Sequence, residues 1–190
     1  MYISSEMLSA ARKRYGIPEY LKTEAVCPEW EMDIIIGSMK DGRAHDLTLF
    51  IFHVGKIAVI AKHSYPPRLY RPPSGGLQPG ETFEDGAVRE ALEETGLSIE
   101  LEKYILHVEI DFRSPTRHVA WTSHVFTARC KGGEIAPRDH DEIREARWAA
   151  LDEFPLFSRL MRVTDSGGFH YRAFLQEEVL KRLPAFPGKV

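Results

Sequence analysis

This sequence has few cysteines, no long apolar run and no excess of basic residues. Its 190 residues include only two cysteines, Cys27 and Cys130, which are too far apart for a metal-type spacing. We expect two free thiols in a reducing compartment, with a disulfide as the alternative. No apolar run approaches the length of a membrane span, and the polar N-terminus is unlike a signal peptide. A cytoplasmic protein without a membrane partner is therefore expected.

The charge balance argues against a nucleic-acid partner. The chain has 25 basic and 28 acidic residues, a formal net charge of -3, so no general attraction to polyanions is expected. Its composition, 43% hydrophobic and 28% charged, is typical of a globular protein, and its length suits one domain. No internal repeat or low-complexity tract is present.

The most informative stretch that is present runs from residue 75 to 97 and combines glycines with clustered acidic residues. Four glutamates gather there: Glu81, Glu90, Glu93 and Glu94. Carboxylates at this density repel one another unless a cation lies among them, and hard divalent cations prefer carboxylate oxygens. A solvated acidic helix is the plain alternative.

The same stretch carries the signals of a capped helix. Thr82 is a suitable N-cap, Asp85 can complete a capping box, and Gly96 follows the last turn. The i, i+3, i+4 spacing of the last three glutamates places them on one face. Val88 and Leu92 lie roughly opposite, and we expect them to pack on the core.

The spacing of these residues resembles the Nudix box, Gly-x5-Glu-x7-Arg-Glu-U-x-Glu-Glu-x-Gly-U, in which U is apolar. The fixed and apolar positions are filled by Gly75, Glu81, Arg89, Glu90, Ala91, Glu93, Glu94, Gly96 and Leu97. The resemblance implies an α+β fold, an α/β/α sandwich with a mixed β-sheet whose box loop and helix carry a metal site. It also implies a hydrolase, dependent on Mg²⁺ or Mn²⁺, that cleaves the pyrophosphate bond of a nucleoside diphosphate linked to another group.

Roles inside the box are expected as follows. The metal ligands are Glu90, Glu94, Glu93 and Glu81, and the catalytic residues are Glu93, Glu94 and Arg89. Arg89 is expected to orient a carboxylate rather than to react. Gly75 and Gly76, without side chains, allow close approach of a phosphate. The box does not decide which glutamate is the general base.

Residues outside the box are expected to complete the site. Four prolines exclude regular structure from residues 62–73, where Arg68 and Arg71 are predicted substrate contacts, with a solvated loop as the alternative. Members of the resembled family often place a further acidic residue near the strand-then-helix ending of the domain. Glu142 and Glu145 are candidates for this ligand or base, with a charged loop as the alternative.

Three parts of the chain are expected. Residues 1–40 form an N-terminal extension with a helix over 5–14 and a strand over 32–36, residues 41–184 form the hydrolase domain, and residues 185–190 form a tail. The extension either packs as a stabilising arm, forms a homodimer contact or covers the substrate. The remaining predicted elements are strands over 47–54, 56–61, 104–112, 117–128 and 143–149 and helices over 151–160 and 169–183.

The substrate stays open at this stage, beyond being a small-molecule nucleotide. The length and the expected extra strand are more similar to ADP-ribose hydrolases than to short triphosphate-sanitising enzymes, so ADP-ribose or a nucleotide sugar is expected first. A pyrophosphohydrolase of nucleoside triphosphates or RNA 5′ ends is the alternative. A non-catalytic, nucleotide-sensing module is the alternative from another class.

Overall fold

The computed structural model describes residues 2–39 and 42–183. The strands are β1 (Glu19–Val26), β2 (His45–His53), β3 (Lys56–Lys62), β4 (Ser74–Gly75), β5 (Ser98–Arg113), β6 (His118–Gly132) and β7 (Ile143–Ala150). The helices are α1 (Ser5–Tyr15), α2 (Glu29–Ser38), α3 (Phe83–Thr95), the 3-10 turn η2 (Leu151–Glu153), α4 (Phe154–Arg162) and α5 (Gly167–Arg182). The expected elements after residue 41 are confirmed, apart from shifted ends.

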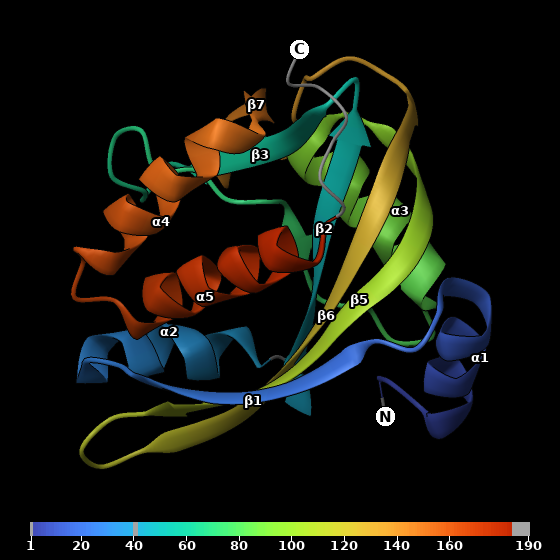
Figure 1. Ribbon diagram of the computed structural model, residues 1–190. Helices are drawn as coiled ribbons and strands as arrows, with labels where there is room; N and C mark the ends of the chain where they lie inside the picture. Colours follow the sequence, from blue (N-terminus) through green and yellow to red (C-terminus); the bar gives the residue numbers. More distant parts are fainter. Residues whose placement is uncertain (1, 40–41, 184–190) are drawn as a thin grey trace.

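All seven strands form one mixed sheet between two groups of helices (Figure 1). The strand order is β1-β5-β6-β2-β3-β7, with the short β4 paired to β2. The β1–β5 and β2–β6 pairs are parallel, whereas the others are antiparallel. This is the α+β sandwich that the box resemblance implies.

Helices cover both faces of the central strands, which explains why β2 and β3 are nearly continuous apolar runs. Leu49 of β2 packs in one cluster with residues of α1 and α3, while its neighbour Phe50 packs in another with residues of α2, α4 and α5. Val54 and Gly55, with φ values of 45° and 72°, make a two-residue turn between the strands, so the first strand ends one residue before its predicted end.

The N-terminal segment differs from its prediction. The helix over residues 5–14 is confirmed as α1, but residues 32–36 lie in α2 and not in a strand. Burial in α2 is one-sided: Met32 is fully buried, whereas Ile34 and Ile36 are exposed, so packing overrides the β-branched preference of the run. The extra strand is β1, which joins the sheet beside β5. The boundary near residue 40 stays a prediction, and residues 185–190 lie outside the described part.

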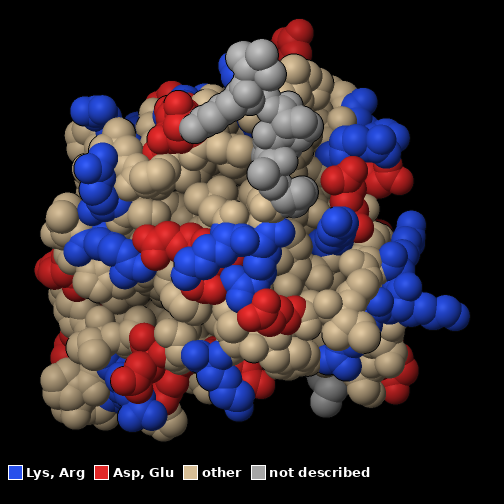
Figure 2. Space-filling model, in the orientation of Figure 1, with Lys and Arg blue, Asp and Glu red and all other residues tan. Residues whose placement is uncertain are grey.

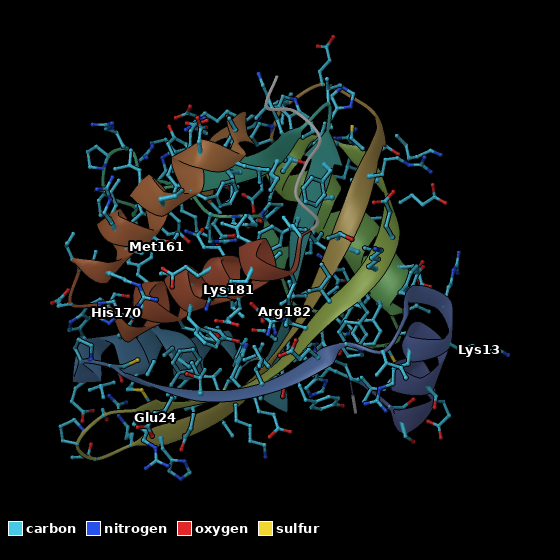
Figure 3. All side chains as sticks on the ribbon, viewed as in Figure 1. Lys13, Glu24, Met161, His170, Lys181 and Arg182 are labelled. Carbon is cyan, nitrogen blue, oxygen red and sulfur yellow. The ribbon has the colours of Figure 1, made fainter. Side chains whose placement is uncertain are left out.

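Helix α5 holds β1 in place at the edge of the sheet. Arg182 donates from Nε to Glu19 of β1 at 2.7 Å and from Nη1 to Glu178 of its own helix at 2.6 Å. Figure 3 shows Arg182 at the end of α5 that approaches β1. The segment before residue 41 is thus joined to the sheet and to the last helix.

A β-bulge interrupts β5. The register with β6 shifts between Tyr104 and Leu106, so Tyr104 packs in the α3-side cluster while Leu106 packs in the other. Strict alternation over the strand predicted at 104–112 would instead put both side chains on one face. His107 on the same strand is only 7% exposed and stacks on Tyr20 of β1 with ring centroids 4.2 Å apart.

Candidate active site

Helix α3 begins and ends at the predicted residues. The Thr82 hydroxyl accepts from the backbone N of Asp85 at 3.1 Å, and the Asp85 carboxylate accepts from the backbone N of Thr82 at 3.3 Å. Gly96 follows the helix with φ 79°, a left-handed conformation that favours glycine. Both ends of the box helix are therefore set by local sequence.

The face that α3 turns inward differs from the prediction. Val88 is 43% exposed and Leu92 is only half-buried, so the expectation that they pack on the core is wrong. The buried face is Phe83, Gly86, Ala87, Glu90, Ala91, Glu94 and Thr95. Because its apolar members beyond the first turn are small, the helix approaches the sheet closely and carries two glutamates inward with it.

The glycines of the box loop make room for charged side chains. A Cβ at Gly75 would lie 1.9 Å from the carboxyl carbon of Glu90, and a Cβ at Gly76 would lie 2.0 Å from Nη1 of Arg43. A side chain at either position would therefore displace Glu90 or Arg43 from its present place. Arg43 is a basic residue at the site that the sequence reasoning missed, because it lies 32 positions before Gly75 with no motif around it.

Arg89 forms hydrogen bonds with three of the four box glutamates. Its Nε donates to Glu81 at 2.7 Å, and its Nη1 donates to Glu90 at 2.7 Å and to Glu93 at 3.0 Å. Its Nη2 donates to the backbone O of Gly76 at 2.8 Å, which fixes the loop to the helix. The Arg89 hydrogen bond lowers the pKa of Glu81. Arg89 thus orients carboxylates, as expected from the sequence.

Glu94 is held from the opposite side by Arg71. Its carboxylate accepts from the backbone N of Ser74 at 2.7 Å and from Nη2 of Arg71 at 3.3 Å. Arg71 is 2% exposed and also donates to the Tyr65 hydroxyl at 2.7 Å and to the backbone O of Pro72 at 2.8 Å. Its guanidinium is occupied inside the protein, which favours positioning of Glu94 over contact with a substrate.

Burial is the main electrostatic influence on the inward glutamates. It raises the pKa of Glu90 to about 7, with the nearby charges of Glu94 and Glu93 adding to the shift and Arg89 opposing it. Burial also raises the pKa of Glu94, against the opposing charge of Arg71. Carboxylates in this condition are stabilised by an adjacent cation.

The carboxylate cluster suits a hard divalent cation by its chemistry, since its donors are oxygens. Glu90 and Glu94 are close enough for their charges to interact, and the Glu93 side chain is 45% exposed. As they stand, no three acidic, histidine or cysteine side chains within residues 2–39 and 42–183 converge tightly enough to hold an ion. Arg89 occupies three of the four carboxylates in this conformation.

The two further acidic candidates lie in different surroundings. Glu142 forms an ion pair with Lys62, and its charge adds to the raised pKa of Glu94, which places it at the edge of the cluster. Glu145 accepts from the Tyr70 hydroxyl at 2.7 Å. Arg68 is exposed, with φ 66°, in the loop before the box.

A cavity of about 480 Å³ opens beside the cluster. Its walls include Trp30 and Ile34 of α2, Tyr65, Trp121, Phe169 and Arg172. The sequence reasoning did not find this cavity, because its aromatic residues come from five separate segments that only the tertiary fold brings together.

The family follows from a match that covers most of the sheet and the box. Residues 48–167 match the model of the NUDIX domain. The chain belongs to the NUDIX family. Elements α1, β1 and α2 precede the matched residues.

Curated relatives and solved structures are similar to parts of this NUDIX chain. The oxidized purine nucleoside triphosphate hydrolase of Mus musculus is 37% identical over 81 residues, which is 43% of this chain and 49% of the relative. The RNA pyrophosphohydrolase of Erythrobacter litoralis (strain HTCC2594) is 34% identical over 98 residues, 44% of this chain and 60% of the relative. The chain thus spans about half the length of the first of these relatives.

One solved structure supports the fold. The crystal structure of a NUDIX hydrolase from Nitrosomonas europaea superposes with a TM-score of 0.52 at 21% identity, covering 76% of each chain. At this identity the likeness concerns the arrangement of helices and strands. It agrees with the mixed sheet and flanking helices described above.

Proposed function

We propose that this protein is a divalent-metal-dependent hydrolase that cleaves the pyrophosphate bond of a nucleoside diphosphate linked to another group. The observation that carries the proposal is the pair Glu90 and Glu94, buried side by side on α3. Arg89 holds one of them and Arg71 the other. Burying two carboxylates is costly, and burial raises the pKa of both even with the two arginines beside them, so a further cation would stabilise the pair.

Each part of the site has a role in this reaction. The carboxylates of Glu90, Glu94, Glu93 and Glu81 would hold Mg²⁺ or Mn²⁺. When bound, such an ion neutralises phosphate charge and lowers the pKa of a coordinated water. Glu93 or Glu94 accepts the proton of the attacking water. Arg89 holds the carboxylates in position through its hydrogen bonds.

The phosphates are placed against the box loop. Gly75 and Gly76 offer a backbone that a phosphate can approach, and Arg43 lies over the second of them. Arg43 and the exposed Arg68 supply the cationic contacts, while Arg71 positions Glu94. Glu142, at the edge of the cluster, is the proposed additional acidic group, with Glu145 second.

ADP-ribose or a nucleotide sugar remains the first proposed substrate, on the argument from chain length. The second candidate is a nucleoside triphosphate or an RNA 5′ end, which the names of the two relatives favour. Lys, Arg, Asp and Glu side chains are interspersed on the face in Figure 2, which gives no broad basic surface for a long polyanion. The face drawn there therefore offers no support for binding of extended RNA.

A substrate panel tests the proposal. Release of nucleoside monophosphate or phosphate is measured from ADP-ribose, nucleotide sugars, nucleoside triphosphates and 5′-triphosphorylated RNA, with Mg²⁺ and with Mn²⁺. Turnover of one class that requires the metal supports the proposal. Binding without turnover across the panel would instead support the nucleotide-sensing module.

Other expectations about the whole protein stay proposals. Within the described residues, no helix is both long and apolar enough to cross a membrane. A cytoplasmic location and a homodimer contact through the N-terminal segment are predictions that cell fractionation and light scattering test.

A further inference from the structure

Helix α2 presents two large apolar side chains to the cavity beside the box. Trp30 is 51% exposed and Ile34 is 63% exposed, and both line the cavity. They are four residues apart on one helix, so they lie on the same face. Large apolar side chains grouped at a cavity mark a binding surface more often than isolated ones do. Helix α2 lies before residue 48, where the family match begins.

A buried carboxylate fixes this helix in position. Glu31 is 7% exposed and accepts from the backbone N of Gly167 at 2.8 Å and of Gly168 at 3.0 Å. The Ser166 hydroxyl, which caps α5, also donates to Glu31. The start of α5 is thereby tied to α2, and Trp30 and Ile34 are held at the mouth of the cavity.

The opposite walls are aromatic with a cationic, hydrogen-bonding edge. Trp121 and Phe169 face the same cavity as Arg172. Arg172 lies 2.8 Å from the Asp46 carboxylate through Nη2, and Trp121 Nε1 donates to Asp46 at 3.2 Å. The Asp46 carboxylate thus fixes the orientation of Arg172 and of the Trp121 ring. Flat apolar walls suit a planar heteroaromatic ring, and the Arg172 guanidinium lies among them as a donor for acceptor atoms on such a ring.

Tyr65 connects the wall of the cavity to the carboxylate cluster by hydrogen bonds. This side chain lines the cavity, and its hydroxyl accepts from Arg71, which in turn donates to Glu94. Lys62 and Glu142 also line the cavity, and their charges act on Glu94.

A second connection passes through Ser38 at the end of α2. Ser38 lines the cavity, and its backbone O accepts from Nη2 of Arg43 at 3.0 Å. The other terminal nitrogen of Arg43 lies over Gly76 of the box loop. A nucleotide whose base lies in the cavity and whose phosphates lie at the box would therefore extend along Arg43.

We propose that this cavity binds the nucleobase of the substrate, and that Trp30 and Ile34 of α2 form the wall against which the base stacks. The proposal rests on the proposed nucleotide hydrolysis and extends it, because it assigns recognition of the base to a helix outside the family match. The volume of about 480 Å³ lies within the usual range for small-ligand sites.

Binding without turnover provides the first test. The full chain, in EDTA, is titrated with AMP, GMP, CMP and UMP and with ribose 5-phosphate, and tryptophan fluorescence is recorded. Two of the three tryptophans, Trp30 and Trp121, line the cavity. We expect at least one nucleoside monophosphate to quench the fluorescence, ribose 5-phosphate to have little effect, and Trp30→Ala to remove most of the quenching.

Kinetics on the best substrate of the panel provide the second test. Trp30→Ala and Ile34→Ala should each raise KM at least about fivefold with kcat unchanged, since stacking on a base is a substantial part of nucleotide affinity. Ile36→Ala is the matched control, because Ile36 is 43% exposed on the same helix and is not among the cavity residues. Its KM should equal that of the wild type.

The outcomes separate the two proposals. Turnover with unchanged KM in Trp30→Ala and Ile34→Ala would overturn the base pocket while leaving the hydrolase intact. Equal quenching by ribose 5-phosphate and the nucleotides would also overturn it. Base-dependent quenching without turnover of any panel substrate would support the pocket and count against the hydrolase.

Discussion

At the scale of single residues, two arginines in different surroundings hold the carboxylates of the site. Arg89 is partly accessible and bonds three glutamates and the loop, whereas Arg71 is buried and holds only Glu94 among the four box glutamates. The motif predicted Arg89 as an orienting residue from its spacing. The role of Arg71 depends on burial, which the proline-rich segment around it does not reveal.

Glu93→Gln and Glu94→Gln test the catalytic carboxylates. A glutamine keeps the size but can neither accept a proton nor neutralise a cation. If either residue is the general base, kcat of its variant should fall about 10²- to 10⁴-fold. Initial rates with Mg²⁺ measure the effect, and Glu102→Gln, an exposed glutamate on β5, is the control. Near wild-type turnover in both purified variants would remove these residues from the mechanism.

Gly75→Ala tests whether loop and helix must touch. The new Cβ would lie 1.9 Å from the Glu90 carboxyl carbon, so Glu90 must move and kcat/KM should fall at least about tenfold. Gly37→Ala is the matched control, because a Cβ there meets nothing within 4 Å and alanine is the better helix former. Unchanged kcat/KM in Gly75→Ala would show that the position of Glu90 is not critical.

Arg71→Met tests the buried pair. Removal of the guanidinium leaves Glu94 buried beside other carboxylates, and the free energy of unfolding should fall by about 3–5 kcal/mol. Urea denaturation measures it. The double variant Arg71→Met with Glu94→Leu should recover part of the loss, since it removes the uncompensated charge. If the double variant is as unstable as the sum of the two single changes, the residues do not act as a pair.

At the scale of elements, the ends of a helix could be predicted from neighbouring residues, whereas the face that it buries could not. The ends of α3 follow from Thr82, Asp85 and Gly96, whose effects act within a few residues. The inward face of α3 was predicted wrongly because Val88 and Leu92 are more apolar than Ala87 and Ala91. The close approach to the sheet selects the smaller side chains, and that choice is not visible in the helix alone.

For helix α2 the prediction of a strand was wrong because it followed intrinsic strand propensity. Three consecutive isoleucines at 34–36 favour a strand by intrinsic preference, which is a weak guide when tertiary contacts compete. Glu31, which looks like an ordinary surface glutamate in the sequence, ties the segment to α5 as a helix. The cavity beside the box was missed for the same reason, because this helix forms one of its walls.

Glu31→Ala tests that link between helices. Loss of the carboxylate leaves two backbone N–H groups of α5 without their acceptor, so unfolding free energy should fall by about 1–3 kcal/mol. Urea denaturation measures the change. Glu24→Ala is the control, because the Glu24 side chain is 71% exposed on β1 (Figure 3). Equal stability of both variants would show that α2 is held by apolar contacts instead.

At the scale of the whole molecule, three histidines are buried on neighbouring strands of the sheet: His45 of β2, His107 of β5 and His124 of β6. Burial lowers the pKa of His45 to about 4 and that of His124 to about 3, and it also lowers the pKa of His107. Asp46 and Glu109 oppose these shifts weakly, whereas Arg12 and Arg43 add to them. The folded protein therefore favours the neutral form of these three histidines.

This arrangement predicts loss of stability in mild acid. The folded-state pKa values lie below the ordinary value of 6.5, so the unfolded chain binds more protons as the pH falls below 6.5. The contribution of each histidine is complete above pH 6.5 and declines by up to about 1.4 kcal/mol per pH unit below it, down to the folded pKa. Urea midpoints between pH 8 and pH 5 measure the slope. His124→Gln should flatten it, whereas His118→Gln, at a side chain 76% exposed, should not. A slope identical in wild type and His124→Gln would assign the acid sensitivity to other groups.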